Sequence, residues 1–229
     1  MQALSAILPH YLLEVNASEV ILSNAPGDQC VPAWVFRELR KASWVVVRRG
    51  TVTRKLIPVG IRGPERSQRW AASCPANAIR QIVTPTDLLK RFEITKDLHK
   101  SPACRALGLL AVDWRWLAHC RWGPGGSVGF ELATGKRTIT PRSDLDIVVY
   151  ANDHLSRSDG RRLLDSARDL EVGVDIRVET PVCGFSLTEY ARPSAVSILL
   201  HTSAGPILGH NPWNGNLCSM SVPMERRLT

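Results

Sequence analysis

The spacing of hydrophobic residues predicts helices and short strands in the first hundred positions of the chain. Some segments repeat apolar residues at helical intervals, and others are β-branched runs separated by turn residues such as Arg49 and Gly50. In chain order, the pattern predicts a helix at 33–42, strands at 44–48 and 55–62, and helices at 75–82 and 85–92. We therefore expect a small α+β unit in this half.

Beyond position 100 the pattern alternates between helices and strands. Ser101 and Pro102 suit the N-cap and first turn of a helix, so a new unit is expected to start there. The expected elements are a helix to about 110, a Gly-rich turn, a strand at 145–151, a helix at 154–170, a strand at 172–179 and a helix from 186. Residues 211–229 lack periodicity and are expected to form a loosely held tail.

These patterns predict an α+β fold with an N-terminal α+β domain at 1–100 and a second, α/β domain with a mixed sheet at 101–210. The longest apolar runs, 43–47 and 145–150, are far shorter than the roughly 18 to 20 residues that span a bilayer. No signal-peptide pattern opens the chain, and the six cysteines lack zinc-ligand spacing. We expect a cytoplasmic protein with reduced thiols and no membrane association.

Positive charge is concentrated in the first half of the chain. Residues 1–100 contain fifteen Lys and Arg against eight Asp and Glu, whereas residues 101–229 contain fourteen against thirteen. This asymmetry favours an anionic partner such as nucleic acid, a polyphosphate or an acidic protein, although a solvated basic surface explains it equally well. Arg37, Arg40 and Lys41 share one face of the helix expected at 33–42 and could present one basic patch.

A Gly-rich segment at 123–129 is the first feature that suggests chemistry. Glycines before a helix allow backbone N–H groups to approach a phosphate, and the Ser127 hydroxyl adds a donor beside Gly126. Gly-rich turns are common, so this segment taken alone is more typical of a plain loop.

Acidic residues at the start of two predicted strands are the second feature. Asp144 and Asp146 are two positions apart at the entry of an apolar strand, so both are expected on one face. Asp175, Arg177 and Glu179 alternate with β-branched residues on the later strand. Carboxylates this close repel each other unless a cation such as Mg²⁺ lies between them. We expect Asp144, Asp146 and Asp175 to bind metal, and we expect Glu179 to lie on the wet face of an edge strand.

The order Gly126-Ser127, Asp144-Leu145-Asp146 and a later strand with Asp175 resembles the polymerase-β-type nucleotidyltransferase pattern. The sixteen residues between Ser127 and Asp144 exceed the short spacer usual there, which suggests an insertion around 134–137. More specifically, the sequences at 126–135 and 143–146 resemble the phosphoribosyl-dephospho-CoA transferases, the holo-acyl-carrier-protein synthases of malonate decarboxylase. So do Val59 to Pro64 with Arg66, Gln68 and Arg69, and Glu179 to Pro181 followed by Leu187 to Glu189, so that the resemblance extends over about 44–208.

This resemblance implies transfer of the phosphoribosyl-dephospho-CoA group from triphosphoribosyl-dephospho-CoA to a serine of the apo acyl-carrier protein subunit of malonate decarboxylase, with release of pyrophosphate. It implies that Asp144, Asp146 and Asp175 hold Mg²⁺ and that Gly126 and Ser127 grip the leaving pyrophosphate. The remaining candidates for donor contacts are arginines: Arg62, Arg66, Arg69 and Arg177. One departure is that the family pattern has a lysine in its final strand, where this chain has His201.

Two other functions remain possible at this level. The metal site alone does not select the donor, so another nucleotidyltransferase that adenylylates a small molecule or a protein fits the same residues. A nucleic-acid-binding module is suggested by the pI of about 9.5 and the seven tryptophans. The tryptophans are dispersed and do not alternate with a basic stripe, so a nucleic-acid partner is disfavoured.

Overall fold

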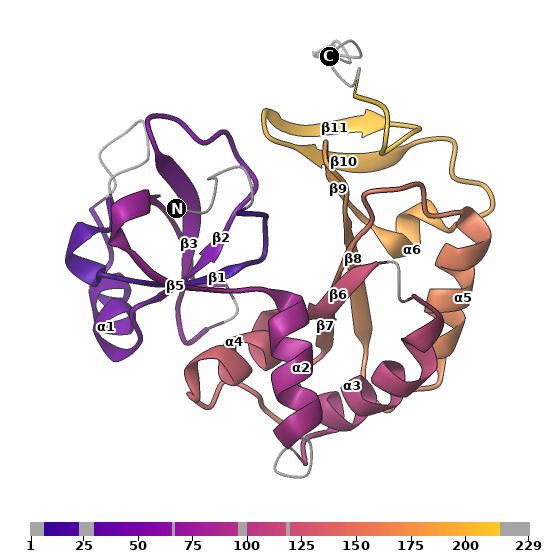
Figure 1. The fold of residues 1–229 in the computed structure, drawn as a ribbon, viewed down its shortest axis with the longest axis horizontal. Helices are drawn as coiled ribbons and strands as arrows, with labels where there is room; N and C mark the ends of the chain where they lie inside the picture. Colours follow the sequence, from indigo (N-terminus) through magenta and orange to yellow (C-terminus); the bar gives the residue numbers. More distant parts are fainter. Residues whose placement is uncertain (1–6, 23–29, 66, 96–99, 118–119, 216–229) are drawn as a thin grey trace, which may run out of the picture.

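The computed structural model contains two sheets that lie side by side, one in each half of the chain (Figure 1). It describes residues 7–22, 30–65, 67–95, 100–117 and 120–215. The predicted α+β class is confirmed, and the second of the two sheets is mixed.

The N-terminal domain is a five-stranded antiparallel sheet with strand order β4-β3-β2-β1-β5. Its strands are β1 (Leu12–Val15), β2 (Trp44–Val47), β3 (Leu56–Arg62), β4 (Arg69–Pro75) and β5 (Ile79–Val83). Helix α1 (Ala33–Lys41) contributes Val35 and Leu39 to the apolar core of this domain. The short 3-10 helices are η2 (Ala17–Glu19) and η3 (Ala76–Ala78).

The second domain is a six-stranded sheet with strand order β11-β10-β9-β8-β7-β6, in which β7 and β8 pair in parallel and the other neighbours are antiparallel. Its strands are β6 (Arg121–Pro124), β7 (Leu145–Tyr150), β8 (Val174–Glu179), β9 (Gly184–Ser186), β10 (Ile198–Thr202) and β11 (Gly205–Gly209). Its helices are α3 (Pro102–Asp113), η5 (Trp114–Leu117), α4 (Gly126–Thr134), α5 (Arg157–Arg168) and α6 (Leu187–Tyr190).

The two faces of this second sheet have different neighbours. Helices α3, α5 and α6 cover the face that points away from the N-terminal domain, and they share its apolar core with Ile147 and Ile176 (Figure 1). Val148 and Tyr150 on the opposite face belong to the core of the N-terminal domain. Because side chains alternate along a strand, this opposite face also carries Asp146.

Most helices and strands predicted from local patterns are present. Ser101 caps α3 as expected, with its hydroxyl oxygen accepting the Cys104 N–H at 3.2 Å. The helix predicted at 75–82 is wrong. There, η3 leads into strand β5, which pairs with β1, so that Val83 lies opposite Leu12. The pairing partner is some seventy positions away in the sequence, beyond the reach of a local pattern.

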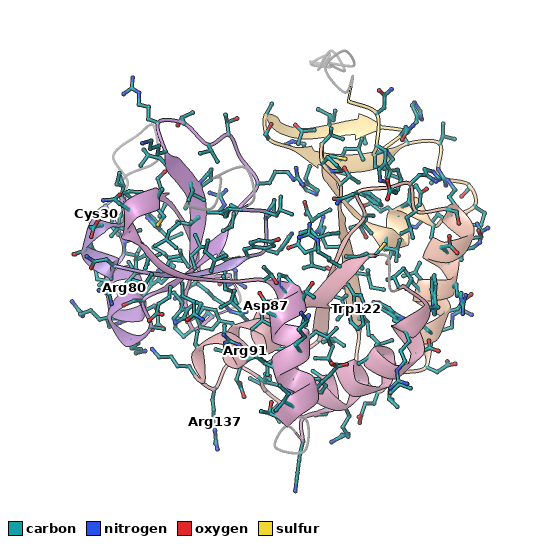
Figure 2. The ribbon with its side chains drawn as sticks, viewed as in Figure 1. Cys30, Arg80, Asp87, Arg91, Trp122 and Arg137 are labelled. Atoms are coloured by element: carbon teal, nitrogen blue, oxygen red, sulfur yellow. The ribbon has the colours of Figure 1, made fainter. Side chains whose placement is uncertain are left out.

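Helix α2 (Pro85–Thr95) lies at the junction between the domains, as the labelled residues Asp87 and Arg91 show (Figure 2). Thr84 caps it, because its hydroxyl oxygen accepts the Asp87 N–H at 3.1 Å. Gly123 of β6 packs against its start so closely that a Cβ there would be 1.9 Å from the Pro85 carbonyl oxygen. The helix therefore packs on the second domain, although the sequence analysis placed it before the boundary at residue 100.

The start of the segment predicted as a tail is in contact with the second domain. The Trp213 indole N–H donates to the Ala151 carbonyl at 3.0 Å, and its ring lies 5.7 Å from those of Phe185 and Tyr190. Residues 216–229 lie outside the described residues.

Glu179 connects the two domains. Its Oε1 lies 3.0 Å from Nε2 of His10, and its other carboxylate oxygen accepts a hydrogen bond from Arg49. Burial alone would raise the pKa of Glu179, but His10 and Arg49 outweigh that effect and hold the pKa below its ordinary value. The expected wet edge position is wrong, because β8 is an interior strand and Glu179 is only 5% exposed.

No helix among the described residues is long and apolar enough to cross a membrane. The tryptophans serve packing: Trp114 and Trp122 are buried with ring centroids 4.8 Å apart, and the remaining five are at least partly buried. A row of exposed rings on which bases could stack is therefore absent from the described residues, which further disfavours the nucleic-acid-binding alternative.

Candidate active site

A cavity of about 820 Å³ lies between the two sheets. Strands β2, β3 and β4 line it from the N-terminal domain, and the start of α4 with strands β7 and β8 lines it from the second domain. The volume is in the upper part of the range of roughly 300 to 1,000 Å³ typical of ligand sites. Eight of the nine predicted site residues line it, and the ninth, Arg66, lies outside the described residues.

The Gly-rich segment forms the amino terminus of α4. Gly125 is the N-cap and donates its N–H to the Asp146 carbonyl at 2.8 Å, which ties the helix start to β7. The first N–H groups of a helix have no partner within it, and they favour an anion. Ser127 at the second helical position is 6% exposed and lines the cavity beside this helix start.

Gly126 permits an unusually close approach of Asp146. The backbone of Gly126 has a φ of 52°, in the left-handed region, and a Cβ there would be 1.7 Å from Oδ2 of Asp146. A side chain at position 126 is therefore excluded both by conformation and by space. The glycine places the carboxylate of Asp146 directly beside the start of α4.

The three aspartates come from two adjacent parallel strands. Asp146 on β7 is in register with Asp175 on β8, so the two side chains leave the sheet on the same face. Asp144 precedes β7 and is exposed, and its Oδ1 lies 3.1 Å from where a Cβ of Gly173 would be. The sequence pattern alone did not show which residue of β8 stands opposite Asp146.

The donor set fits Mg²⁺ by chemical type, because three carboxylates line one cavity from neighbouring strands. Within the described residues, however, no three Asp, Glu, His or Cys side chains are grouped closely enough to hold a metal ion. The aspartates therefore share a face and a cavity without converging on one point.

Arginines line the cavity from both domains. Arg62 on β3 and Arg69 on β4 are directly opposite each other in the antiparallel ladder, and both line the cavity with Arg177 of β8. The guanidinium group of arginine matches the oxygens of a phosphate. The cavity is thus suited to a phosphate-bearing ligand.

The cavity also contains residues that the sequence analysis did not select. Arg48 and His10 line it from the N-terminal domain, and Arg142 lines it from the segment before Asp144. Their sequence surroundings give no catalytic motif, and a basic residue after a strand is an ordinary surface feature. His201, at the place of the family lysine, does not line this cavity.

The long spacer between Ser127 and Asp144 is formed by α4 itself and a returning segment. Helix α4 ends at Gly135, whose φ of 69° suits a left-handed cap. The Glu131 carboxylate then accepts the backbone N–H groups of Thr138 and Ile139 at 2.7 and 2.8 Å. These bonds hold the returning segment, whose residues Thr138 and Thr140 line the cavity.

A cavity that joins carboxylates, a helix amino terminus and several arginines is typical of an enzyme that transfers a phosphate-bearing group. Comparison with known proteins identifies the family. Residues 8–85 match the Phosphoribosyl-dephospho-CoA transferase MdcG N-terminal domain, and residues 89–212 match the Phosphoribosyl-dephospho-CoA transferase MdcG C-terminal domain. The chain belongs to the phosphoribosyl-dephospho-CoA transferase family. The two family domains meet where α2 begins.

Individual relatives support this assignment. The chain is 34% identical over 208 residues to a phosphoribosyl-dephospho-CoA transferase of Klebsiella pneumoniae strain 342, covering 90% of this chain and 96% of that protein. It is 37% identical over 201 residues to the enzyme of that name from Pseudomonas aeruginosa, covering 85% and 92%. It is 35% identical over 192 residues to the enzyme of that name from Azotobacter vinelandii, covering 81% of this chain and 87% of that protein. No solved structure matches the chain.

Proposed function

We propose that this enzyme transfers the phosphoribosyl-dephospho-CoA group from its 5″-triphosphate form to a serine of the apo acyl-carrier protein subunit of malonate decarboxylase. The observation that carries the proposal is one cavity, lined by both family domains, that contains three aspartates and the start of α4. A CoA-derived donor also fits the cytoplasmic location expected from the sequence.

The reaction replaces a phosphoanhydride bond of the donor with a phosphodiester bond to the carrier serine. The carrier serine oxygen forms a bond to the α-phosphorus of the donor, the bond from that phosphorus to the β-phosphate oxygen breaks, and pyrophosphate leaves. Asp175 is exposed at the cavity wall and accepts the serine proton. Ser127 and the N–H groups at the start of α4 bind the departing pyrophosphate, whose negative charge increases during the reaction.

Asp144, Asp146 and Asp175 would hold Mg²⁺ together with oxygens of the bound triphosphate, because Mg²⁺ is usually bound by one or two carboxylates and by substrate phosphates. When bound, the metal supplies positive charge to the triphosphate and polarises the attacking hydroxyl. Arg62 and Arg69 of the N-terminal domain orient the donor.

The decisive experiment is mass spectrometry of the apo carrier subunit after incubation with enzyme, Mg²⁺ and triphosphoribosyl-dephospho-CoA. The expected result is a mass increase equal to one phosphoribosyl-dephospho-CoA group on one serine, with release of pyrophosphate. A parallel reaction with ATP tests the alternative nucleotidyltransferase function. Adenylylation from ATP without modification from the CoA-type donor contradicts the proposal.

Replacing Ser127 with alanine is expected to slow transfer moderately. The change removes one neutral donor to phosphate, which corresponds to about 1 to 3 kcal/mol, or roughly a 5- to 150-fold lower rate. Steady-state kinetics at saturating Mg²⁺ measure this, with thermal unfolding to confirm that the protein is folded. A Ser127→Ala variant as inactive as an aspartate variant contradicts a role limited to phosphate binding.

The basic face of α1 is our proposed contact for the acidic carrier protein. Arg37, Arg40 and Lys41 are exposed on this helix, as the sequence pattern suggested. Burial lowers the pKa of Lys136, Glu38 of α1 opposes that shift, and Lys41 adds to it. The charges of Glu38 and Lys41 thus act on Lys136, which follows the cap of α4.

Reversing Arg37, Arg40 and Lys41 to Glu is expected to raise the KM for the carrier on the order of tenfold and to leave the KM for the donor unchanged. The wild-type on-rate should also fall steeply as salt rises from about 0.01 M to 0.15 M, where the Debye length shrinks from roughly 30 Å to 8 Å. The matched control reverses three exposed arginines of the second domain: Arg115, Arg161 and Arg168. A salt-insensitive on-rate, or an altered donor KM, contradicts this contact.

A further inference from the structure

Two arginines of the cavity have no assigned phosphate group: Arg177, a candidate for donor contacts from the sequence, and Arg48, which the sequence did not single out. Arg48 follows β2 and Arg177 lies in the middle of β8, and both line the cavity from opposite domains. Within the described residues, neither guanidinium has an acidic partner, and Arg177 forms no ion pair with Asp175 two positions earlier.

The buried carboxylate of Glu179 contacts other residues and pairs with neither arginine. Glu179 lies two positions after Arg177 on the same face of β8, but its two oxygens are already occupied by His10 and Arg49. Arg49 directly follows Arg48 in the chain, so this contact draws the end of β2 toward β8. The cavity wall therefore has an excess of positive charge beside the contact between the domains.

This positive charge also affects the pKa of His201. Burial is the main cause that lowers the pKa of His201, and the guanidinium of Arg177 is the next cause. Arg177 is partly buried, where a cation is unfavourable without a counter-ion. The guanidinium forks of Arg48 and Arg177 match the oxygens of a phosphate or diphosphate.

The absence of a side chain at Gly60 leaves space for Arg48. A Cβ at Gly60 on β3 would lie 3.2 Å from Cδ of Arg48, so the aliphatic part of Arg48 lies across this glycine. Gly60 itself lines the cavity. The glycine lets the long side chain lie along the wall, with its head free to reach a ligand.

Arg177 lies further along β8 than the aspartate at the start of that strand. Asp146 and Asp175 are in register at the start of β7 and β8, and Gly126 touches Asp146. Arg177 is two residues further along β8 and Glu179 four, which correspond to about 7 Å and 13 Å of strand. If the triphosphate of a ligand binds at Ser127, a different anionic group of the same ligand must contact the arginines.

We propose that Arg48 and Arg177 form a second phosphate subsite, which binds the internal diphosphate of a CoA-type nucleotide while Ser127 and the aspartates bind the triphosphate. This proposal rests on the proposed function, because the donor named there carries both groups. It assigns the arginine pair to recognition of the group that is transferred rather than of the group that leaves.

The test measures, by calorimetry at 0.15 M salt, the binding of two probes that each represent one of the two phosphate groups. The probes are dephospho-CoA, which contains only the internal diphosphate, and inorganic tripolyphosphate with Mg²⁺, which represents the leaving end. Arg48→Ala and Arg177→Ala are each expected to weaken dephospho-CoA binding about tenfold, equivalent to about 1.4 kcal/mol, and to change tripolyphosphate binding less than twofold. Arg48 is exposed, so its variant remains informative if Arg177→Ala is unstable.

Arg137→Ala is the matched control. Arg137 is exposed, does not line the cavity and extends away from the protein (Figure 2), so its loss removes the same charge without touching the subsite. The subsite is overturned if dephospho-CoA binding is unchanged in both variants, if both probes weaken equally, or if tripolyphosphate alone weakens. Failure of the wild-type enzyme to bind dephospho-CoA contradicts the proposed function itself, which distinguishes the two failures.

Discussion

Replacing Asp146 with asparagine is expected to leave the protein folded and to reduce the rate of transfer at least about a thousandfold, equivalent to about 4 kcal/mol. The substitution keeps the size of the side chain, so the close contact with Gly126 is preserved. It removes the negative charge that stands in register with Asp175 and beside the start of α4. Transfer to the apo carrier, measured at saturating Mg²⁺ with circular dichroism as a folding check, tests this expectation.

Asp113→Asn is the matched control for Asp146→Asn. Asp113 is exposed at the end of α3 and does not line the cavity, so the same chemical change there should leave transfer unaffected. Near-normal turnover of the Asp146→Asn enzyme at saturating Mg²⁺ would show that the aspartates do not form the metal site.

Replacing Glu179 with alanine is expected to lower the free energy of unfolding by about 3 to 5 kcal/mol. Removing one partner of a buried ion pair leaves the other charge without compensation, and here Arg49 is only 17% exposed. The change also removes the contact of His10, so both links from the N-terminal domain to β8 are lost. Urea unfolding followed by tryptophan fluorescence measures the difference.

A second glutamate–arginine ion pair provides the control for Glu179→Ala. Glu171 pairs with Arg105 at 2.7 Å on the surface of the second domain, where solvent screens the interaction, so Glu171→Ala should change stability far less. Equal effects of the two substitutions would contradict the role of Glu179 in holding the domains together.

The contribution of Glu179 should also depend on pH. Because the folded-state pKa is below the ordinary value, the ionised carboxylate stabilises the fold fully above the ordinary pKa of about 4.3. This contribution is lost as the pH falls through the lowered folded-state pKa. The stability difference between wild type and Glu179→Ala should therefore shrink in acid, and a difference independent of pH contradicts an ionic contribution.

Local sequence patterns were sufficient for many elements and for the motifs of the site. The helical spacing at 33–42 corresponds to α1, the Ser101-Pro102 start corresponds to α3, and the alternating run at 172–179 contains β8. Each pattern depends on residues close together in the chain, where capping and periodicity act directly. The same patterns failed at 75–82, because β5 exists through its pairing with β1.

The sequence by itself determined that the chain has an α+β fold and that Gly126, Ser127 and three aspartates are the candidates for phosphate chemistry, because these features lie within short segments. Only the tertiary structure decided that Asp146 stands opposite Asp175, that Glu179 is buried between the domains, and that Arg48 and Arg177 line one cavity from different domains. Register, burial and the approach of two domains depend on contacts between residues distant in the chain. No local periodicity contains that information.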